Sequence, residues 1–188
     1  MDGARDLRLL ELLRGRTPVS VLDVKWRRPI RISAYVGAAE MPQDLVTSVR
    51  CIVRIDDSVV LCRNRDGRTH AMPGGHRQPG ESYADTARRE VEEETGWLID
   101  TDSLTQLGFL HLYNLGEPLD PYPHPDVLQL VTAAMATGRA AEAWTDADGY
   151  ELSSKLVPLS EAEHHVSAEE AQSNPFLRAL RALDQQCR

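Results

Sequence analysis

The alternation of apolar and polar residues along the chain predicts a series of β-strands separated by turns. The strands are expected at residues 19–24, 30–36, 48–55, 58–64, 104–115, 126–136 and 155–159. The third and fourth of these meet at Asp56-Asp57, a dipeptide that favours a tight turn, so they are expected to form a hairpin. Glycine and proline crowd residues 67–80, and residues 139–152 are polar, so both stretches are expected to be loops.

Three segments carry helical signals, at residues 4–14, 82–96 and 174–187. The central helix begins at Ser82, which has the spacing of a capping box with Asp85, and it ends at Gly96. The last helix has Asn174 in position to cap its first turn and Pro175 as its first helical residue. Strands that flank a central and a C-terminal helix indicate an α/β fold.

The length of 188 residues favours one domain over the whole chain, 1–188, with residues 1–45 as an N-terminal helix and strand extension. The formal net charge of −8 argues against a nucleic-acid binder, which neutralises phosphates with lysine and arginine. An acidic protein can still bind small phosphate compounds where a divalent cation mediates. The N-terminal 45 residues could pair between two copies, so a homodimer is a further expectation.

No apolar run approaches the roughly 20 residues that a membrane span needs, and charged residues interrupt the leucines of the N-terminal segment. We therefore expect no membrane partner, no secretory signal and a cytoplasmic location. The three cysteines are too few and too scattered to predict a disulfide framework or a zinc site.

Six carboxylates crowd the central helix and the residues just before it. At 100° per residue, Glu90, Glu93 and Glu94 share an arc about 100° wide. Ala87 and Val91 form an apolar stripe beside this arc, so the three acids lie at the edge of the buried face. Burying a charged carboxylate at the edge of the core without a partner costs free energy, so these acids are expected to have partners.

Two interpretations of this acidic cluster stay open from the residues alone. The acids could pair with neighbouring arginines, for example Glu93 with Arg89 four residues before it. They could instead bind a hard cation such as Mg²⁺ or Mn²⁺, which prefers oxygen ligands. A glycine-rich loop ahead of the helix would bring backbone groups close to the metal or to a phosphate.

The segment 74–97 resembles the Nudix box, G-x5-E-x7-R-E-U-x-E-E-x-G-U, in which U is a bulky apolar residue. The residues that match its specified positions are Gly75, Glu81, Arg89, Glu90, Val91, Glu93, Glu94, Gly96 and Trp97. A chance match over the whole chain has a probability on the order of 10⁻⁷ with average residue usage. The resemblance therefore favours the cation site.

The resemblance implies an α/β/α sandwich with a mixed β-sheet, in which the box forms a loop, a helix and a second loop. It implies hydrolysis of a pyrophosphate linkage in a nucleoside diphosphate bound to a further group, or in a nucleoside triphosphate, with Mg²⁺ or Mn²⁺ as cofactor. Glu90, Glu93 and Glu94 take the metal-ligand positions, together with the carbonyl of Gly74. Arg89 takes the place of the arginine that orients a glutamate. Gly75 and Glu81 take supporting positions.

Residues outside the box provide further candidates. The catalytic base in this family lies in the box or on a later loop, where Asp146, Asp148 and Glu151 are candidates. Candidates for substrate binding are Arg63 and Arg65, from an arginine cluster ahead of the box, and Tyr113. The alternative function is a nucleotide-binding sensor on the same fold without catalysis.

Overall fold

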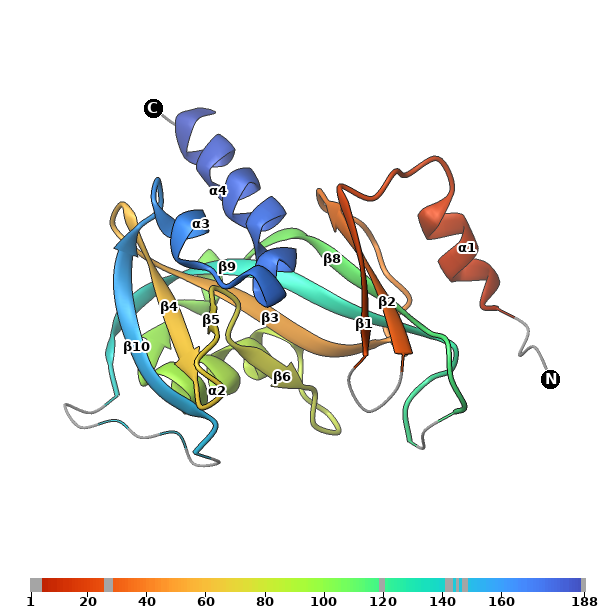
Figure 1. The fold of residues 1–188 in the computed structure, drawn as a ribbon, viewed down its shortest axis with the longest axis horizontal. Helices are drawn as coiled ribbons and strands as arrows, with labels where there is room; N and C mark the ends of the chain where they lie inside the picture. The colour runs from red at the N-terminus through yellow and green to blue at the C-terminus, as the bar shows by residue number, and fades with distance from the viewer. Residues whose placement is uncertain are drawn as a thin grey trace.

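A mixed β-sheet forms the centre of the structure, a computed structural model that describes residues 5–25, 29–118, 121–140, 144, 146 and 149–186. Within these residues the sheet has ten strands, with the order β1-β2-β8-β9-β3-β4-β10 along its main path (Figure 1). Only β3 and β9 pair in parallel among the described strands. The strands are β1 (Ser20–Lys25), β2 (Pro29–Val36), β3 (Val46–Ile55), β4 (Ser58–Asn64), β5 (Thr69–His70), β6 (Gly74–His76), β7 (Trp97–Ile99), β8 (Thr105–Asn114), β9 (Asp126–Arg139) and β10 (Glu151–Pro158).

Helices cover the two faces of this sheet. The helices are α1 (Leu7–Leu13), α2 (Tyr83–Thr95), η1 (Thr101–Ser103), α3 (Ala162–His165), η2 (Ala168–Ser173) and α4 (Asn174–Gln186). On one face, Val91 of α2 and Leu9 of α1 belong to a single buried cluster with the sheet residues. On the other face, Phe176 and Leu180 of α4 belong to a second cluster. The expected α/β/α sandwich is therefore confirmed.

The expected hairpin is present between β3 and β4. Arg54 pairs with Val59 across it, and Asp56 has the positive φ of 51° that a tight turn between strands requires. Beyond the turn the two strands diverge, because the edge of β3 that faces β4 at the turn pairs further along with β6, and the facing edge of β4 pairs with β5. The space where they part is the position of the cleft described below.

The last strand is longer than its apolar residues predict. β10 begins at Glu151, inside the stretch expected to be a loop, because it pairs antiparallel with β4 from Asn64 to Ser58. The 67–80 stretch likewise contains the short strands β5 and β6, which pair with β4 and β3. In both places tertiary pairing provides the strand where the local sequence gives no signal.

The C-terminal helix begins differently from its predicted form. Asn174 has helical dihedral angles, because the 3₁₀ helix η2 continues directly into α4. The prediction that Asn174 caps the helix is therefore wrong, and its buried side-chain oxygen has no hydrogen-bond partner within the described ranges. Pro175 lies in the first turn of α4, as expected.

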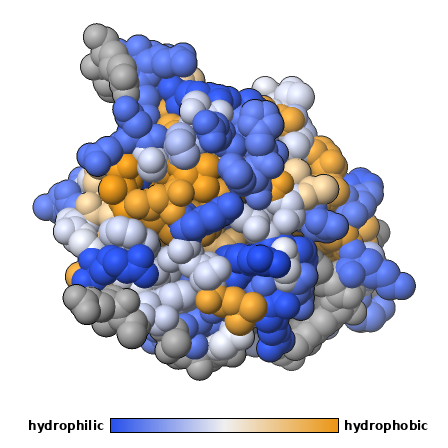
Figure 2. All heavy atoms as spheres, turned by 60° about the vertical axis from the view of Figure 1, so that its left-hand side comes forward, coloured by the Kyte–Doolittle hydropathy of each residue, from blue (hydrophilic) through white to orange (hydrophobic). Residues whose placement is uncertain are grey.

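β10 forms one edge of the sheet, and its side of the molecule is turned forward in Figure 2. Leu152 and Leu156 are exposed on this strand, with Lys155 beside them. Figure 2 shows hydrophobic patches on this side that hydrophilic side chains surround. A charged side chain on an edge strand disfavours pairing with another chain.

The described helices include none with the length and apolar composition that a membrane-spanning helix needs.

Candidate active site

The caps of α2 fix where the box glutamates lie. Ser82 Oγ accepts a hydrogen bond from the Asp85 N–H at 3.1 Å, and Asp85 Oδ2 accepts one from the Ser82 N–H at 3.2 Å. The predicted capping box is thus present. The helix ends at Gly96, whose φ of 70° is a conformation that glycine adopts without strain. Because Ala87 and Val91 are buried against the sheet, the glutamate flank is turned toward β6.

Two glycines allow the backbone of β6 to lie directly against other groups of the site. A Cβ atom on Gly74 would be 2.1 Å from the Val49 carbonyl oxygen. One on Gly75 would be 2.5 Å from the Glu90 carboxylate. The Gly74 N–H donates a hydrogen bond to Glu94 Oε2 at 2.8 Å. The absence of a side chain at both positions therefore brings backbone amide and carbonyl groups to the glutamates.

Arg89 connects three of the glutamates of the box. Its Nε and Nη2 donate to the two carboxylate oxygens of Glu81 at 2.7 and 3.0 Å. Its Nη1 donates to Glu90 at 2.7 Å and to Glu93 at 3.0 Å, and Nη2 also donates to the His76 carbonyl. The hydrogen bonds from Arg89 hold the pKa of Glu81 at about 2. The predicted ion pair between Arg89 and Glu93 is therefore present. Arg89 also orients Glu90 and Glu93, two of the candidate metal ligands, so arginine pairing and cation binding do not exclude each other.

Arg50 on β3 also lies in the site, although the sequence analysis does not predict it there. Its guanidinium donates a hydrogen bond to the Gly74 carbonyl and lies close enough to Glu90 and Glu94 to favour their charged forms. Burial nevertheless raises the pKa of Glu94 to about 7, and it raises the pKa of Glu90 as well. The sequence signal for Arg50 is a basic residue within a predicted strand of mostly apolar residues, which indicates a functional or paired side chain.

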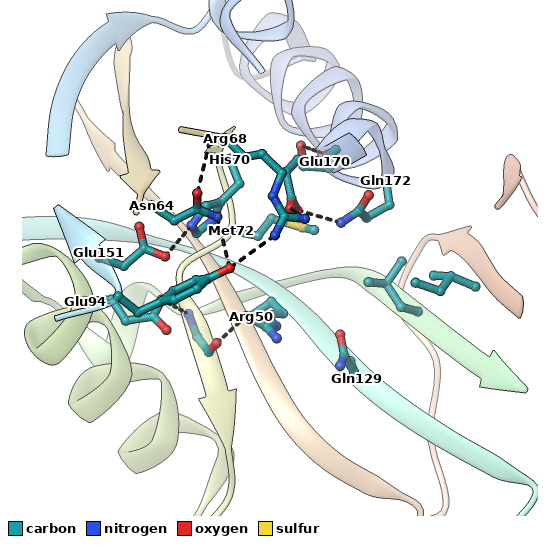
Figure 3. Close-up of a pocket in the computed structure, with 15 residues that line it drawn as sticks. Arg50, Asn64, Arg68, His70, Met72, Glu94, Gln129, Glu151, Glu170 and Gln172 are labelled. Carbon is teal, nitrogen blue, oxygen red and sulfur yellow. Dashed lines mark hydrogen bonds and ion pairs between the residues drawn. The ribbon is translucent and has the colours of Figure 1, made fainter. Parts of the chain in front are cut away.

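A cleft of about 410 Å³ opens beside these residues (Figure 3). Figure 3 shows Glu94 and Glu151 close together at one side, and Glu170 and Gln172 near the start of α4. Arg68 lies between these groups and donates to Glu170 at 3.4 Å. The residues that line the cleft are Ile32, Arg50, Asn64, Arg68, His70, Met72, Gly74, Glu94, Leu110, Gln129, Tyr150, Glu151, Glu170, Gln172 and Ser173.

The three candidates for a loop base differ in where they lie. Asp146 accepts hydrogen bonds from the N–H groups of Tyr150 and Glu151 at 2.7 and 3.0 Å, so its carboxylate holds the turn into β10. Asp148 lies outside the described residues. Glu151 lines the cleft beside Glu94. One of its carboxylate oxygens is 2.9 Å from Nε2 of His70, and the other is buried without a hydrogen-bond partner among the described residues.

The structure does not bring the three candidates for substrate binding to the described lining of the cleft. Arg63 is exposed, and on β4 its side chain lies on the opposite face from that of its neighbour Asn64, which lines the cleft. The Arg65 guanidinium lies 5.2 Å from the ring centre of Tyr150, outside the lining. Tyr113 on β8 instead has the Arg5 guanidinium at 5.2 Å from its ring centre. The arginines that line the cleft are Arg50 and Arg68.

The oxygen atoms gathered on this flank of α2 suit a hard divalent cation. Glu90, Glu93 and Glu94 provide carboxylates, and the Gly74 carbonyl faces a guanidinium in the same place. The raised pKa values of Glu90 and Glu94 mean that added positive charge would stabilise their ionised forms. A set of oxygen donors favours Mg²⁺ or Mn²⁺ over softer metals. These residues therefore fit the metal that the box implies.

Replacing Glu94 with glutamine should stabilise the metal-free protein at pH 8. A pKa near 7 in the folded protein exceeds the ordinary value of 4.5, so the ionised carboxyl destabilises the fold as pH rises from about 4.5 to 7. The glutamine oxygen can still accept from the Gly74 N–H but carries no charge. We expect the free energy of unfolding in EDTA to rise by about 1–3 kcal/mol at pH 8 and to change little at pH 4.5. Urea unfolding at both pH values measures this, and a loss of stability at pH 8 would contradict it.

We compared the chain with models of protein families and with solved structures. The model of the NUDIX domain family matches residues 44–180. The structure of the pyrophosphohydrolase BsRppH of Bacillus subtilis is similar, with a TM-score of 0.61 and 19% identity over 87% of this chain and 97% of that one. A NUDIX hydrolase from Nitrosomonas europaea has a TM-score of 0.50 and 20% identity, over 73% of this chain and 89% of that one.

The family match spans more than half of the chain and contains the whole box, from Gly75 to Trp97. It also contains α2, the cleft-lining strands β3, β4 and β10, and the start of α4. The two solved structures agree with the sandwich described above. The chain therefore belongs to the Nudix hydrolase family, as the resemblance of its box implies.

Proposed function

We propose that this protein hydrolyses a pyrophosphate linkage in a nucleoside diphosphate derivative or a nucleoside triphosphate, with Mg²⁺ or Mn²⁺ as cofactor. The observation that carries the proposal is that Gly74 and Glu94 of the box line the 410 Å³ cleft, joined by a hydrogen bond from the Gly74 N–H to the Glu94 carboxylate. The name of the Bacillus subtilis protein, a pyrophosphohydrolase with the same fold, agrees with this activity.

The metal ligands would be Glu90, Glu93, Glu94 and the Gly74 carbonyl, with Glu81 and Arg89 holding two of these side chains in place. A divalent ion bound there would neutralise phosphate charge and lower the pKa of a coordinated water. The reacting linkage would then lie beside Glu94. The acidic surface of the protein is no obstacle to such a substrate, because the ion offsets the repulsion.

The remaining groups of the cleft have distinct uses for a diphosphate substrate. Arg50 and Arg68 present guanidinium groups to the cleft, where they can donate hydrogen bonds to phosphate oxygens. Glu151 has one carboxylate oxygen that no described residue hydrogen-bonds, so it can accept a proton from an attacking water molecule. His70 holds the other oxygen and thereby orients this carboxylate. We assign the role of proton acceptor to Glu151.

A substrate panel tests the proposal. Release of phosphate or pyrophosphate would be measured from nucleoside triphosphates, ADP-ribose, nucleotide sugars and dinucleoside polyphosphates, with Mg²⁺, with Mn²⁺ and with EDTA. We expect turnover of at least one class with metal, its loss in EDTA and its recovery when excess Mg²⁺ is added. Binding of nucleotides without any turnover would instead support the sensor function.

A further inference from the structure

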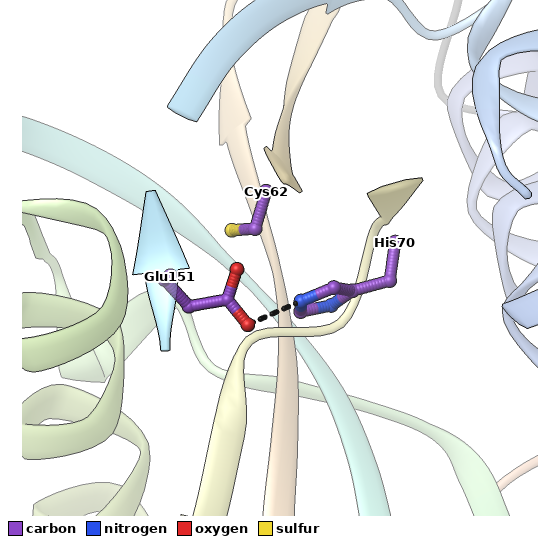
Figure 4. Close-up of side chains that lie close together, drawn as sticks. All are labelled: Cys62, His70 and Glu151. Atoms are coloured by element: carbon purple, nitrogen blue, oxygen red, sulfur yellow. Dashed lines mark hydrogen bonds and ion pairs between the residues drawn. The ribbon is translucent and has the colours of Figure 1, made fainter. Parts of the chain in front are cut away.

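A second group of metal-binding side chains lies in the wall of the cleft, outside the box. The Sγ atom of Cys62, a ring nitrogen of His70 and a carboxylate oxygen of Glu151 all lie within 4.8 Å of one another (Figure 4). Figure 4 shows the Glu151 carboxylate between the Cys62 sulfur and the His70 ring. We propose that these three side chains bind a borderline transition-metal ion of the Zn²⁺ class.

The donor set is the first reason. Thiolate, imidazole and carboxylate are ligands of Zn²⁺ and related ions, whereas Mg²⁺ prefers oxygen donors alone. A tetrahedral ion with bonds of about 2.0–2.3 Å requires donor atoms about 3.3–3.8 Å apart. Separations of at most 4.8 Å need only small side-chain rotations to reach that range. The number and spacing of the cysteines do not predict this site, because it contains a single cysteine and its other two ligands are a histidine and a glutamate.

The second reason is an unsatisfied buried group at the same place. The Glu151 side chain is 3% exposed, and its second carboxylate oxygen has no hydrogen-bond partner in the part of the chain that the structure describes. A buried carboxylate oxygen without a partner is unfavourable, and a bound cation would satisfy it. Cys62 is fully buried, and burial together with nearby carboxylates raises the pKa of its thiol, so an ion would have to displace a proton there.

The backbone around this group is firmly held, which favours a formed site. Cys62 on β4 pairs directly with His70 on β5. On its other side, β4 pairs with β10, where Glu151 opposes Asn64. Three hydrogen-bonded strands therefore fix the three ligands relative to one another. Because His70 and Glu151 also line the cleft, a fourth position is open to water or to a ligand.

An ion at this site would occupy the carboxylate that we assign as proton acceptor. Zinc binding and hydrolysis would then exclude each other, a consequence that rests on the proposed function. The binding itself does not depend on that function. A test of binding alone therefore distinguishes failure of the zinc site from failure of the activity.

Cobalt spectroscopy provides that test. The protein would be stripped of metal, kept reduced, supplied with excess Mg²⁺ to fill the box site, and titrated with Co²⁺. We expect a near-ultraviolet thiolate-to-cobalt band that saturates at one ion per chain and disappears when one equivalent of Zn²⁺ is added. The band should persist in Cys51→Ala, which removes a second buried cysteine, and in Glu93→Gln, which alters only the box.

The variants of the site itself should lose the signal. In Cys62→Ala we expect the band to be absent and the Zn²⁺ affinity, from competition with a coloured chelator, to fall by at least about 100-fold. His70→Gln, at a partly exposed position, should lower the affinity about as much and serves as the test if Cys62→Ala does not fold. The absence of a band in the wild-type protein, or its survival in Cys62→Ala, would overturn the proposal.

Discussion

Replacing Glu94 with glutamine should lower kcat for the hydrolysis by at least about 100-fold, although the metal-free protein becomes more stable. Glutamine keeps the oxygen that accepts the Gly74 N–H but removes the negative charge that a divalent cation needs. Under the proposed function, a weaker metal site would no longer activate water or neutralise phosphate, and such contributions account for large rate factors. Steady-state kinetics over a range of Mg²⁺ concentrations measures both kcat and the apparent affinity for the metal.

Glu92→Gln is the matched control for this substitution. Glu92 lies on the same helix and carries the same charge, but helical geometry turns it away from the arc of Glu90, Glu93 and Glu94. Its activity should stay close to that of the wild-type protein. Equal losses in both variants would show that the charge of the helix as a whole matters, and unchanged activity in Glu94→Gln would exclude Glu94 as a metal ligand.

Most of the fold could be predicted from local signals. The capping pair Ser82 and Asp85, the final Gly96 and the turn at Asp56-Asp57 each have a mechanism that acts within a few residues. The start of β10 has no such signal, because the segment from Glu151 onward is polar and becomes a strand by pairing with β4. Local sequence patterns therefore predict the elements that are stabilised by residues close to them in the sequence, and not the strands that form only by pairing.

The same distinction explains the outcome for the site. Helical spacing alone placed Glu90, Glu93 and Glu94 on one flank, since a helix has a fixed period. Which arginines face the cleft depends instead on strand register and on how β3 and β4 diverge. Arg50 therefore has no local signal that would predict its place in the cleft, and Arg63, predicted from its place in an arginine cluster, is exposed and absent from the described lining.

Replacing Arg89 with alanine should lower the free energy of unfolding by about 2–4 kcal/mol in the absence of divalent metal. The guanidinium is the hydrogen-bond partner of Glu81, Glu90 and Glu93, and its own side chain is 20% exposed. Its loss would leave two carboxylates that are at most 16% exposed without their cation. Removing one member of a partly buried ion pair is destabilising mainly because of the charge that stays behind. Chemical unfolding in EDTA measures the difference.

Arg88→Ala separates this effect from the loss of any arginine on α2. Arg88 is exposed, so its removal should change the stability by no more than about 0.5 kcal/mol. Added Mg²⁺ should recover part of the stability of Arg89→Ala, because a bound cation compensates Glu90 and Glu93 in the same place where the guanidinium did. Recovery by Mg²⁺ in Arg89→Ala but not in a double variant with Glu94→Gln would tie the guanidinium and the metal to one shared set of carboxylates. If Mg²⁺ had no effect on either protein, Arg89 would have a structural role alone.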